Sequence, residues 1–168
     1  MLHFNRKTEY ALLALEHMHR REGESGAITS AREISEAYHI PYPLLAKVMQ
    51  KLAGKGLIKS VHGTKGGYIL ARRAEAITIA CVVEIFEGPV AVAECFKSEP
   101  ITCPQWDGCL IKDPFFELNR KIFDLLTQTT LIDLVGKGVV ANLPTYPENS
   151  ERVLAESDSF RSDKRSER

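Results

Sequence analysis

Apolar residues near the start of the chain recur at the three- and four-residue spacing of helices that bury one face. This spacing predicts a first helix from Asn5 to about Arg21, with a buried stripe formed by Ala11, Ala14, Leu15 and Met18. Ser30 followed by Glu33 is a capping box, in which each side chain hydrogen-bonds the backbone of the other residue. The box predicts a second helix that begins there and ends near Tyr38.

A third helix and a hairpin follow. The helix should begin in the Pro-Tyr-Pro segment 41–43, because proline suits a first helical turn, and end near Ala53. Residues 57–61 and 68–71 are predicted to be short strands joined by the glycine-rich turn 62–67. Three helices followed by such a hairpin indicate a winged helix-turn-helix, whose second motif helix enters the major groove of DNA.

The second half of the chain has a different pattern. Thr78 is predicted to cap a helix over residues 79–87, and a long helix should run from Asp113 to about Thr129. The long helix has apolar residues on two faces: Phe115, Leu118, Ile122 and Leu125 on one, Phe116, Phe123 and Leu126 on the other. One face can cover its own domain, so we expect the other to meet a partner subunit. A short helix should close the pattern over residues 130–135.

The fold class predicted is therefore mainly α with a small β-hairpin wing, a winged helix-turn-helix followed by a long dimerisation helix. We assign residues 1–75 to a DNA-binding domain and residues 76–137 to a loop with the dimerisation helices. Residues 138–168, which end in a charged and serine-rich stretch, are expected to be a disordered tail.

Charge is unevenly distributed, although the formal net charge is zero. Residues 1–73 hold 12 Lys and Arg against 6 Asp and Glu, and the remainder holds 10 against 16. A basic part joined to an acidic part suggests that one end meets a polyanion, although ordinary surface charge could give the same split. No stretch suggests a membrane span or a secretory signal, so a cytoplasmic location is expected.

Three of the four cysteines lie in one loop with the spacing C-x7-C-x5-C, at Cys95, Cys103 and Cys109. The prolines and glycine between them disfavour helix and strand. Reduced cysteines clustered in a loop indicate a metal or redox site, which could be an iron–sulfur cluster, a zinc site or a thiol–disulfide switch. Cys81 lies in an apolar helix and is expected to be a buried small hydrophobe.

Four stretches in order resemble the IscR/NsrR-type (Rrf-family) transcription regulators. They are Thr8-Glu9-Tyr10-Ala11-Leu12 in the first helix, residues 40–47 (IPYPLLAK), residues 57–68 (LIKSVHGTKGGY) and residues 130–134 (TLIDL). The resemblance covers about residues 1–137. It implies a homodimer, a long helix that crosses to the partner, and often a loop of three cysteines that holds an iron–sulfur cluster, either 2Fe-2S or 4Fe-4S.

The resemblance also directs attention to the fourth ligand. Lys112 stands where IscR-like relatives place a histidine ligand, and a charged lysine cannot ligate. NsrR-like relatives use an acidic side chain from the first helix of the other subunit, and Glu9 matches that position. We therefore expect Cys95, Cys103, Cys109 and Glu9 to be the metal and cluster ligands. The gap between the first two cysteines is wider than is usual in IscR-like members.

DNA contacts are expected on the third helix and on the wing. The candidates are Pro41, Tyr42, Ala46, Lys47, Gln50 and Lys51 on the helix, and His62, Thr64 and Lys65 on the wing. Lys and Gln side chains suit base edges in the major groove, whereas other lysines are expected to meet phosphates. His62 stands where the family's wing usually carries an arginine.

The function predicted is a dimeric DNA-binding transcription regulator that binds a pseudo-palindromic operator and senses iron, redox or nitric oxide status through its cluster. A cluster-free regulator that responds by thiol oxidation or partner binding is the alternative. An iron–sulfur electron-transfer protein is a third possibility, but it has no need of a lysine-lined helix and a glycine wing. No catalytic grouping with supporting context is present, so we do not expect an enzyme.

Overall fold

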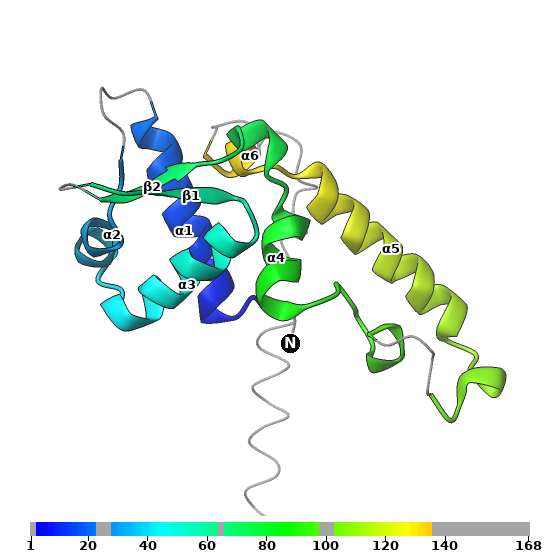
Figure 1. Ribbon diagram of the computed structural model, residues 1–168. Helices are drawn as coiled ribbons and strands as arrows, with labels where there is room; N and C mark the ends of the chain where they lie inside the picture. Colours follow the sequence, from blue (N-terminus) through cyan, green and yellow to red (C-terminus); the bar gives the residue numbers. More distant parts are fainter. Residues whose placement is uncertain (1–2, 23–27, 64–65, 98–102, 136–168) are drawn as a thin grey trace, which may run out of the picture. The chain divides into compact units, whose positions relative to one another are not determined.

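The computed structural model describes residues 3–22, 28–63, 66–97 and 103–135 (Figure 1). Its elements in chain order are α1 Arg6–Arg21, α2 Ala31–Tyr38, α3 Tyr42–Gly54, β1 Ile58–Val61, β2 Gly67–Leu70, the 3-10 turn η1 Ala74–Ala76, α4 Ile79–Glu87, the 3-10 turns η2 Glu94–Phe96 and η3 Trp106–Gly108, α5 Lys112–Gln128 and α6 Leu131–Val135. The chain divides into two units, residues 1–137 and 138–168. The expected disordered tail lies outside the described residues.

Each predicted helix is present, and three begin at a side-chain cap. Asn5 caps α1, Ser30 caps α2 by accepting from the Glu33 amide, and Thr78 caps α4 by accepting from the Cys81 amide. These caps satisfy amides that have no partner inside the helix, which is why the starts could be predicted locally. A mainly α fold with a small hairpin is therefore confirmed.

The turn between α2 and α3 depends on one residue in a left-handed conformation. His39 follows the last residue of α2 and has a φ of 53°, the only positive φ among the described residues other than glycine. Its amide bonds the Ser35 carbonyl, and the Ser35 hydroxyl donates to the Ile40 carbonyl at 2.7 Å. The chain thus reverses tightly enough for α3 to pack across α1 and α2.

The core joins α1, α2, α3 and the wing hairpin, together called the head, to α6, the last helix of the described chain. Its fully buried side chains include Leu15, Ile34, Leu45, Leu52, Ile77 and Leu131. Leu131 reaches this core because α6 is joined to the start of α4: the Leu131 amide bonds the Ile77 carbonyl at 2.8 Å. The closing helix is therefore a part of the head's packing and not an appendage.

The wing is a two-stranded antiparallel hairpin with Ile58 opposite Leu70 and Val61 opposite Gly67. Thr29, in the segment before α2, adds a short bridge to the other edge of β2, with two hydrogen bonds of 2.8 and 2.9 Å to Tyr68. A Cβ at Gly67 would lie 2.7 Å from the Thr29 carbonyl oxygen. Glycine at this position therefore permits the close approach that ties the wing to the head.

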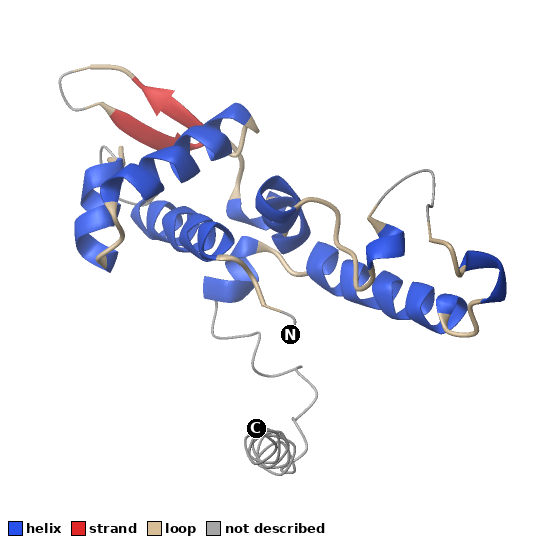
Figure 2. Cartoon of the chain, turned by 90° about the horizontal axis from the view of Figure 1, so that it is seen from below, coloured by secondary structure: helices blue, strands red, loops and turns tan. Residues whose placement is uncertain are grey.

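α5 runs out from the packed helices α1, α3 and α4, as both ribbon views show (Figures 1 and 2). None of its residues is buried in the single chain, and Phe116 and Leu125 are among its exposed apolar residues. The loop before it was expected to contain neither helix nor strand, but two single 3-10 turns occur there. No described helix is long and apolar enough to cross a membrane.

Candidate DNA-binding surface and cysteine loop

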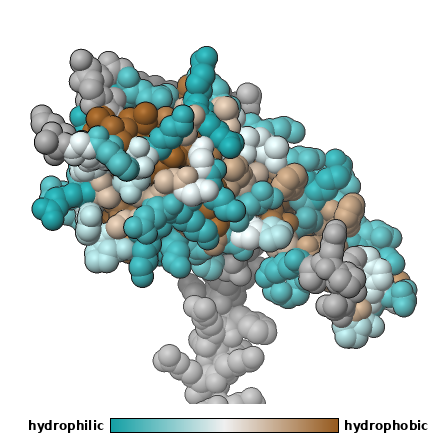
Figure 3. Space-filling model, viewed as in Figure 1, coloured by the Kyte–Doolittle hydropathy of each residue, from teal (hydrophilic) through white to brown (hydrophobic). Residues whose placement is uncertain are grey.

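α3 presents the predicted DNA-reading residues on the face opposite its buried stripe. The buried stripe comprises Leu45, Val48, Met49 and Leu52. On the other face Pro41, Tyr42, Lys47, Gln50 and Lys51 are exposed and Ala46 is half-buried. Hydrophilic side chains cover the region of α2 and α3 in Figure 3. An exposed polar face at this place in a helix-turn-helix is available to base edges.

The wing supplies a second exposed polar surface. His62 is exposed at the end of β1, and Lys59 is exposed on the strand itself. Thr64 and Lys65, the other two predicted wing contacts, lie outside the described residues. The part of the wing that the structure describes thus places one predicted minor-groove residue and one phosphate-binding candidate at the surface.

Lys51 has a contact that the sequence did not predict. Its Nζ lies 5.2 Å from the centre of the Phe86 ring, in the last turn of α4. A cation over an aromatic face is an attractive interaction, about 0.5–1 kcal/mol at an exposed site. Lys51 therefore links α3 to α4, the helix that leads into the cysteine loop.

All four cysteines are free thiols, and each is half-buried. Cys81 packs against the hydrophobic core from α4, as expected for a cysteine used as a small apolar residue, although it is not fully buried. Cys95 lies in η2, and Cys109 directly follows η3. The Cys103 thiol donates to the Gln105 side chain at 3.5 Å.

Three contacts hold the described ends of the cysteine loop. The Val92 amide donates to the Asn119 side-chain oxygen of α5 at 2.9 Å. The Phe96 ring meets the Phe116 ring edge-on, with centroids 6.2 Å apart. At the other end Lys112 lies 5.3 Å from the centre of the Trp106 ring. The loop is thus fixed to α5 on both sides of the undescribed residues 98–102.

The three loop cysteines suit an iron–sulfur cluster by the chemistry of their donor atoms, since thiolates are its usual ligands. Among the described residues, no three Cys, His, Asp or Glu side chains come together closely enough to hold a metal ion. The three loop cysteines are free, but in this single chain they are not gathered. Lys112 stands where the resemblance places a histidine ligand in some relatives. Its Nζ lies over the Trp106 ring.

Glu9, the candidate fourth ligand, lies in the first turn of α1. Its Oε2 accepts from the Arg6 guanidinium at 2.9 Å, and the side chain is partly exposed. An exposed ion pair of this kind stabilises a protein by less than about 1 kcal/mol, so it could be exchanged for another partner. The single chain does not bring Glu9 into a group with the cysteines.

Glu87, at the end of α4, was not singled out by the sequence. Its Oε1 accepts from the Asn5 amide at 2.9 Å and from the Thr8 hydroxyl at 2.7 Å. The two partners are 82 and 79 residues away in sequence, so no local pattern indicated the contact. Gly88 and Pro89 follow at once, so the residue that holds the start of α1 adjoins the beginning of the cysteine loop.

A second unpredicted network joins the end of α1 to α2. The two ring nitrogens of His17 lie 3.3 Å from the Tyr38 hydroxyl and 3.2 Å from the Glu33 carboxylate, which also pairs with Arg21. Partial burial raises the pKa of Glu33, but the hydrogen bonds from His17, Arg21 and the Ser30 backbone, with the Arg21 charge, lower it below its ordinary value. The network stabilises the packing of α2 against the end of α1.

Comparison with known proteins identifies the family. Residues 4–137 match the model of Rrf2, described as an iron-dependent transcriptional regulator. The chain belongs to the Rrf2 family of transcriptional regulators. The winged-helix architecture and the surface polar face of α3 agree with that membership, and the resemblance drawn from the sequence is confirmed.

Individual members of the Rrf2 family show how far the likeness extends. The chain is 33% identical over 133 residues to the regulator NsrR of Shouchella clausii, covering 76% of this chain and 85% of NsrR. It is 29% identical over 151 residues to IscR of Pectobacterium atrosepticum, covering 89% and 88%. The structure of CymR, the global cysteine regulator of B. subtilis, matches with a TM-score of 0.64 and 26% identity, covering 80% of this chain and 96% of CymR.

Proposed function

We propose that this Rrf2-family regulator is a homodimer whose operator affinity depends on an iron–sulfur cluster held by the cysteine loop. The observation that carries the proposal is the set of three free, half-buried thiols in a loop that is attached on both sides to α5. Three thiolates supply three ligand positions and leave one iron site for a weaker ligand. The protein then acts in the cytoplasm, where its DNA lies and thiols stay reduced.

Cys95, Cys103 and Cys109 are the cluster ligands in this proposal, and Glu9 of the partner subunit completes the set. The weak ion pair of Glu9 with Arg6 supports this role, since little energy is needed to release the carboxylate. A bound cluster, 2Fe-2S or 4Fe-4S, would supply a centre that reacts with oxidants or nitric oxide. The chain's own part is to hold the three thiolates and to connect them to the head.

DNA is read by the exposed face of α3 and by the wing. Lys47 and Gln50 suit base edges in the major groove, whereas Lys55 and Lys59 suit phosphates. A two-fold symmetric dimer requires a pseudo-palindromic operator, with recognition helices about one helical turn, roughly 34 Å, apart. The basic surplus of residues 1–73 supports the assignment of this end to DNA.

Signal transmission follows the physical connections between loop and head. Gly88 joins the loop to α4, where Glu87 holds the start of α1 and Phe86 contacts Lys51 of α3. A change in the loop that moves the end of α4 therefore acts on both helices. A coupling free energy of about 1–3 kcal/mol would change operator affinity roughly 5–150-fold.

The alternative is a regulator that responds by thiol oxidation without a cluster. The free and half-buried state of the loop cysteines supports it too, because oxidants can reach such thiols. The two functions differ in metal content. A thiol switch needs no iron, and its reduced and oxidised forms differ in free thiol count.

The test is anaerobic purification followed by counts of iron and sulfide and a visible absorbance spectrum. The proposal expects about two or about four irons per subunit with matching sulfide. Single Cys→Ser variants at positions 95, 103 and 109 should lose the cluster, whereas Cys81→Ser, outside the loop, should keep it. A colourless protein without iron whose DNA binding changes with peroxide would favour the thiol switch instead.

A further inference from the structure

One aromatic ring outside α3 lies against a lysine of the proposed DNA-binding face. The Nζ atom of Lys51 is 5.2 Å from the centre of the Phe86 ring, which belongs to the last turn of α4. Lys51 is exposed, whereas Phe86 is half-buried and packs against the hydrophobic core. The ring is therefore the fixed partner in this contact, and the long lysine side chain is the partner that it restrains.

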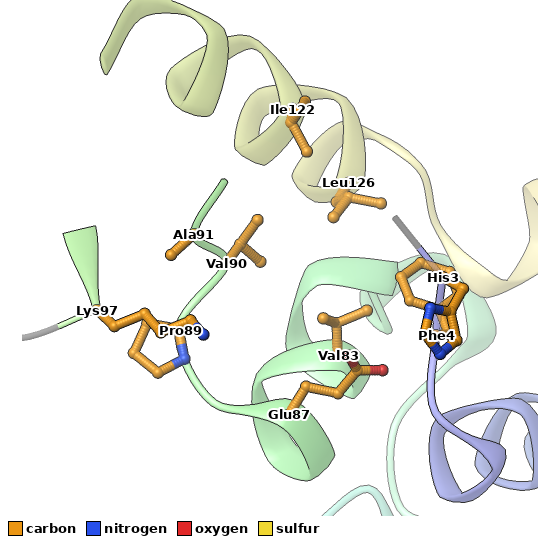
Figure 4. Close-up of a pocket in the computed structure, with 10 residues that line it drawn as sticks. All are labelled: His3, Phe4, Val83, Glu87, Pro89, Val90, Ala91, Lys97, Ile122 and Leu126. Carbon is orange, nitrogen blue, oxygen red and sulfur yellow. The ribbon is translucent and has the colours of Figure 1, made fainter. Parts of the chain in front are cut away.

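The last turn of α4 is itself held in place by α1. Glu87, the residue after Phe86, accepts a hydrogen bond of 2.7 Å from the Thr8 hydroxyl. Figure 4 shows Glu87 on the wall of a cavity of about 530 Å³, with Ile122 of α5 on another wall. The cavity separates Glu87 from Ile122, so α1, and not this part of α5, fixes the turn that carries the Phe86 ring.

Lys51 differs in this respect from the other lysines of α3 and its end. Lys47, one turn earlier, and Lys55, directly after α3, are exposed as well. In the described part of the chain neither side chain has an ion pair, a hydrogen bond or a ring contact, and the Lys51 side chain has only its contact with Phe86. Lys51 therefore keeps its charge available for a ligand while its position is restrained.

A restrained lysine is better prepared to bind a phosphate than a freely moving one. A lysine side chain loses rotamer freedom when it is immobilised at an interface, which lowers affinity by about two- to tenfold. Contact with the ring removes part of that freedom before DNA binds. The ring covers one side of the ammonium, and the ammonium has several N–H donors, so the remaining donors can meet phosphate oxygens.

We propose that Phe86 is a positioning residue for DNA binding: its ring holds the Lys51 ammonium where a phosphate of the DNA backbone is bound. The inference rests on the DNA contact of the proposed function and adds a residue from outside α3 and the wing. Phe86 itself touches no DNA in this arrangement. Phosphate contacts do not depend on base sequence, so the contribution of Phe86 should be the same for every duplex.

Substitution of the ring tests this role in the full-length protein. Phe86→Leu keeps an apolar side chain and removes the aromatic face. Its affinities for a selected operator and for a scrambled duplex, measured by fluorescence anisotropy, should fall by the same factor, about two- to tenfold. Phe86→Tyr keeps the ring and should restore both affinities to within about 1.5-fold of wild type.

Ile85→Val is the matched control, because Ile85 is the half-buried neighbour of Phe86 on α4. Both of its affinities should stay within about 1.5-fold of wild type. Far-UV circular dichroism checks that all variants are folded. An unchanged or higher affinity for Phe86→Leu overturns the inference.

A double-variant cycle separates positioning of Lys51 from general packing of α4. Lys51→Met removes the charge and keeps most of the apolar stem. In the Lys51→Met protein, Phe86→Leu should change affinity by less than about 1.5-fold, whereas in the Lys47→Met protein it should cause its full loss. Equal losses of affinity in the two backgrounds would show that Phe86 acts through packing alone, and they would overturn the inference.

Proton chemical shifts of the Lys51 side chain report the contact itself. Protons that lie over an aromatic ring are shifted upfield, so the Lys51 Cε protons should move downfield in Phe86→Leu. The upfield shift should persist in the complex with DNA, because the ring holds the ammonium while the phosphate binds. Loss of the shift on DNA binding would show that Lys51 leaves the ring, and this result also contradicts a positioning role.

The outcomes separate this inference from the proposed function. Iron content is measured on the same samples, so a change in cluster content is distinguished from a change in DNA contact. If wild type and Phe86→Leu bind DNA equally well, the role of Phe86 alone is removed. If wild type binds neither duplex, the DNA-binding function fails together with this inference.

Discussion

The Thr8 hydroxyl donates a hydrogen bond of 2.7 Å to the Glu87 carboxylate, which joins the first turn of α1 to the last turn of α4. Thr8 is fully buried, and the same carboxylate oxygen also accepts from the Asn5 amide. The hydroxyl has a second, longer contact of 3.3 Å with the Asn5 side-chain oxygen. Loss of the short bond to the charged carboxylate costs about 1–3 kcal/mol. This contact therefore fixes the start of the DNA-binding head to the residue before the cysteine loop.

We predict that Thr8→Val and Glu87→Ala each lower the free energy of unfolding by about 1–3 kcal/mol, because each removes one partner of this hydrogen bond. The double variant should lose less than the sum, with an interaction energy of about 0.5–3 kcal/mol. Urea denaturation of wild type, the two single variants and the double variant gives this interaction energy.

Glu84→Gln, an exposed carboxylate one turn earlier on α4, is the matched control and should change stability by less than about 0.5 kcal/mol. Strictly additive effects of Thr8→Val and Glu87→Ala would show that the two side chains stabilise the protein independently.

The parts of the fold that depend on neighbouring residues could be predicted from the sequence. Ser30 and Thr78 cap the next helix through amides three residues away, so composition and spacing were enough. The contact of Thr29 with Tyr68 and that of Lys51 with Phe86 join segments distant in sequence, and no periodicity encodes them.

The candidate site was predictable only as a set of residues. The spacing of Cys95, Cys103 and Cys109 singled out candidate donors, and the exposed face of α3 followed from its buried stripe. Their arrangement depends on what surrounds the loop. In the single chain the described thiols do not meet, and Glu9 pairs with Arg6. The proposed site takes Glu9 from a second subunit, and the pattern of one chain does not show how two chains meet.

Glu33 should make stability depend on pH at the acid end. Its pKa is lower in the folded protein than in the unfolded chain, so the folded state binds fewer protons there. The stabilisation is present above the ordinary glutamate pKa of about 4.3 and is lost as the pH falls through the lowered folded pKa. The carboxylate is 35% exposed, so screening limits the effect to less than about 1 kcal/mol.

Urea denaturation between neutral pH and about pH 3 measures this contribution. Glu33→Gln should reduce stability at neutral pH and flatten the acid loss, whereas Glu36→Gln, exposed on the same helix, should retain the wild-type profile. A Glu33→Gln profile parallel to that of wild type at every pH would contradict the role assigned to this carboxylate.

Gln50→Ala should weaken binding to the selected operator while leaving binding to random DNA unchanged. A side-chain contact to a base edge discriminates by about 1–3 kcal/mol, which corresponds to roughly 5–150-fold. Fluorescence anisotropy with an operator obtained by in vitro selection and with a scrambled duplex measures both affinities. Equal losses of affinity for the two duplexes would show that Gln50 contacts the DNA backbone and not the bases.

Lys59→Gln should have the opposite signature. A lysine that contacts a phosphate contributes equally to the affinity for every DNA sequence. Affinities for the operator and for the scrambled duplex should therefore fall by the same factor. The slope of log affinity against log salt should fall by about 1, the change expected for one lost phosphate contact. Glu75→Gln, which removes an exposed negative charge beyond the wing, is the control and should leave the slope unchanged.

Gly67→Ala should destabilise the junction of wing and head, because the new Cβ would lie 2.7 Å from both the Thr29 carbonyl oxygen and the Ile28 side chain. The Thr29 backbone cannot move away without breaking its bridge to Tyr68. We therefore expect the free energy of unfolding to fall by about 1–3 kcal/mol. Urea denaturation measures the loss, and salt-dependent DNA binding reports the altered wing.

Gly54→Ala is the matched control and should act in the opposite direction. A Cβ at Gly54 meets nothing within 4 Å, and the residue is the last of α3. Alanine there reduces the conformational freedom of the unfolded chain without strain in the folded one, so stability should rise by about 0.4–1 kcal/mol. If both substitutions proved neutral, the close approach of Thr29 to β2 would not be what requires glycine in the wing.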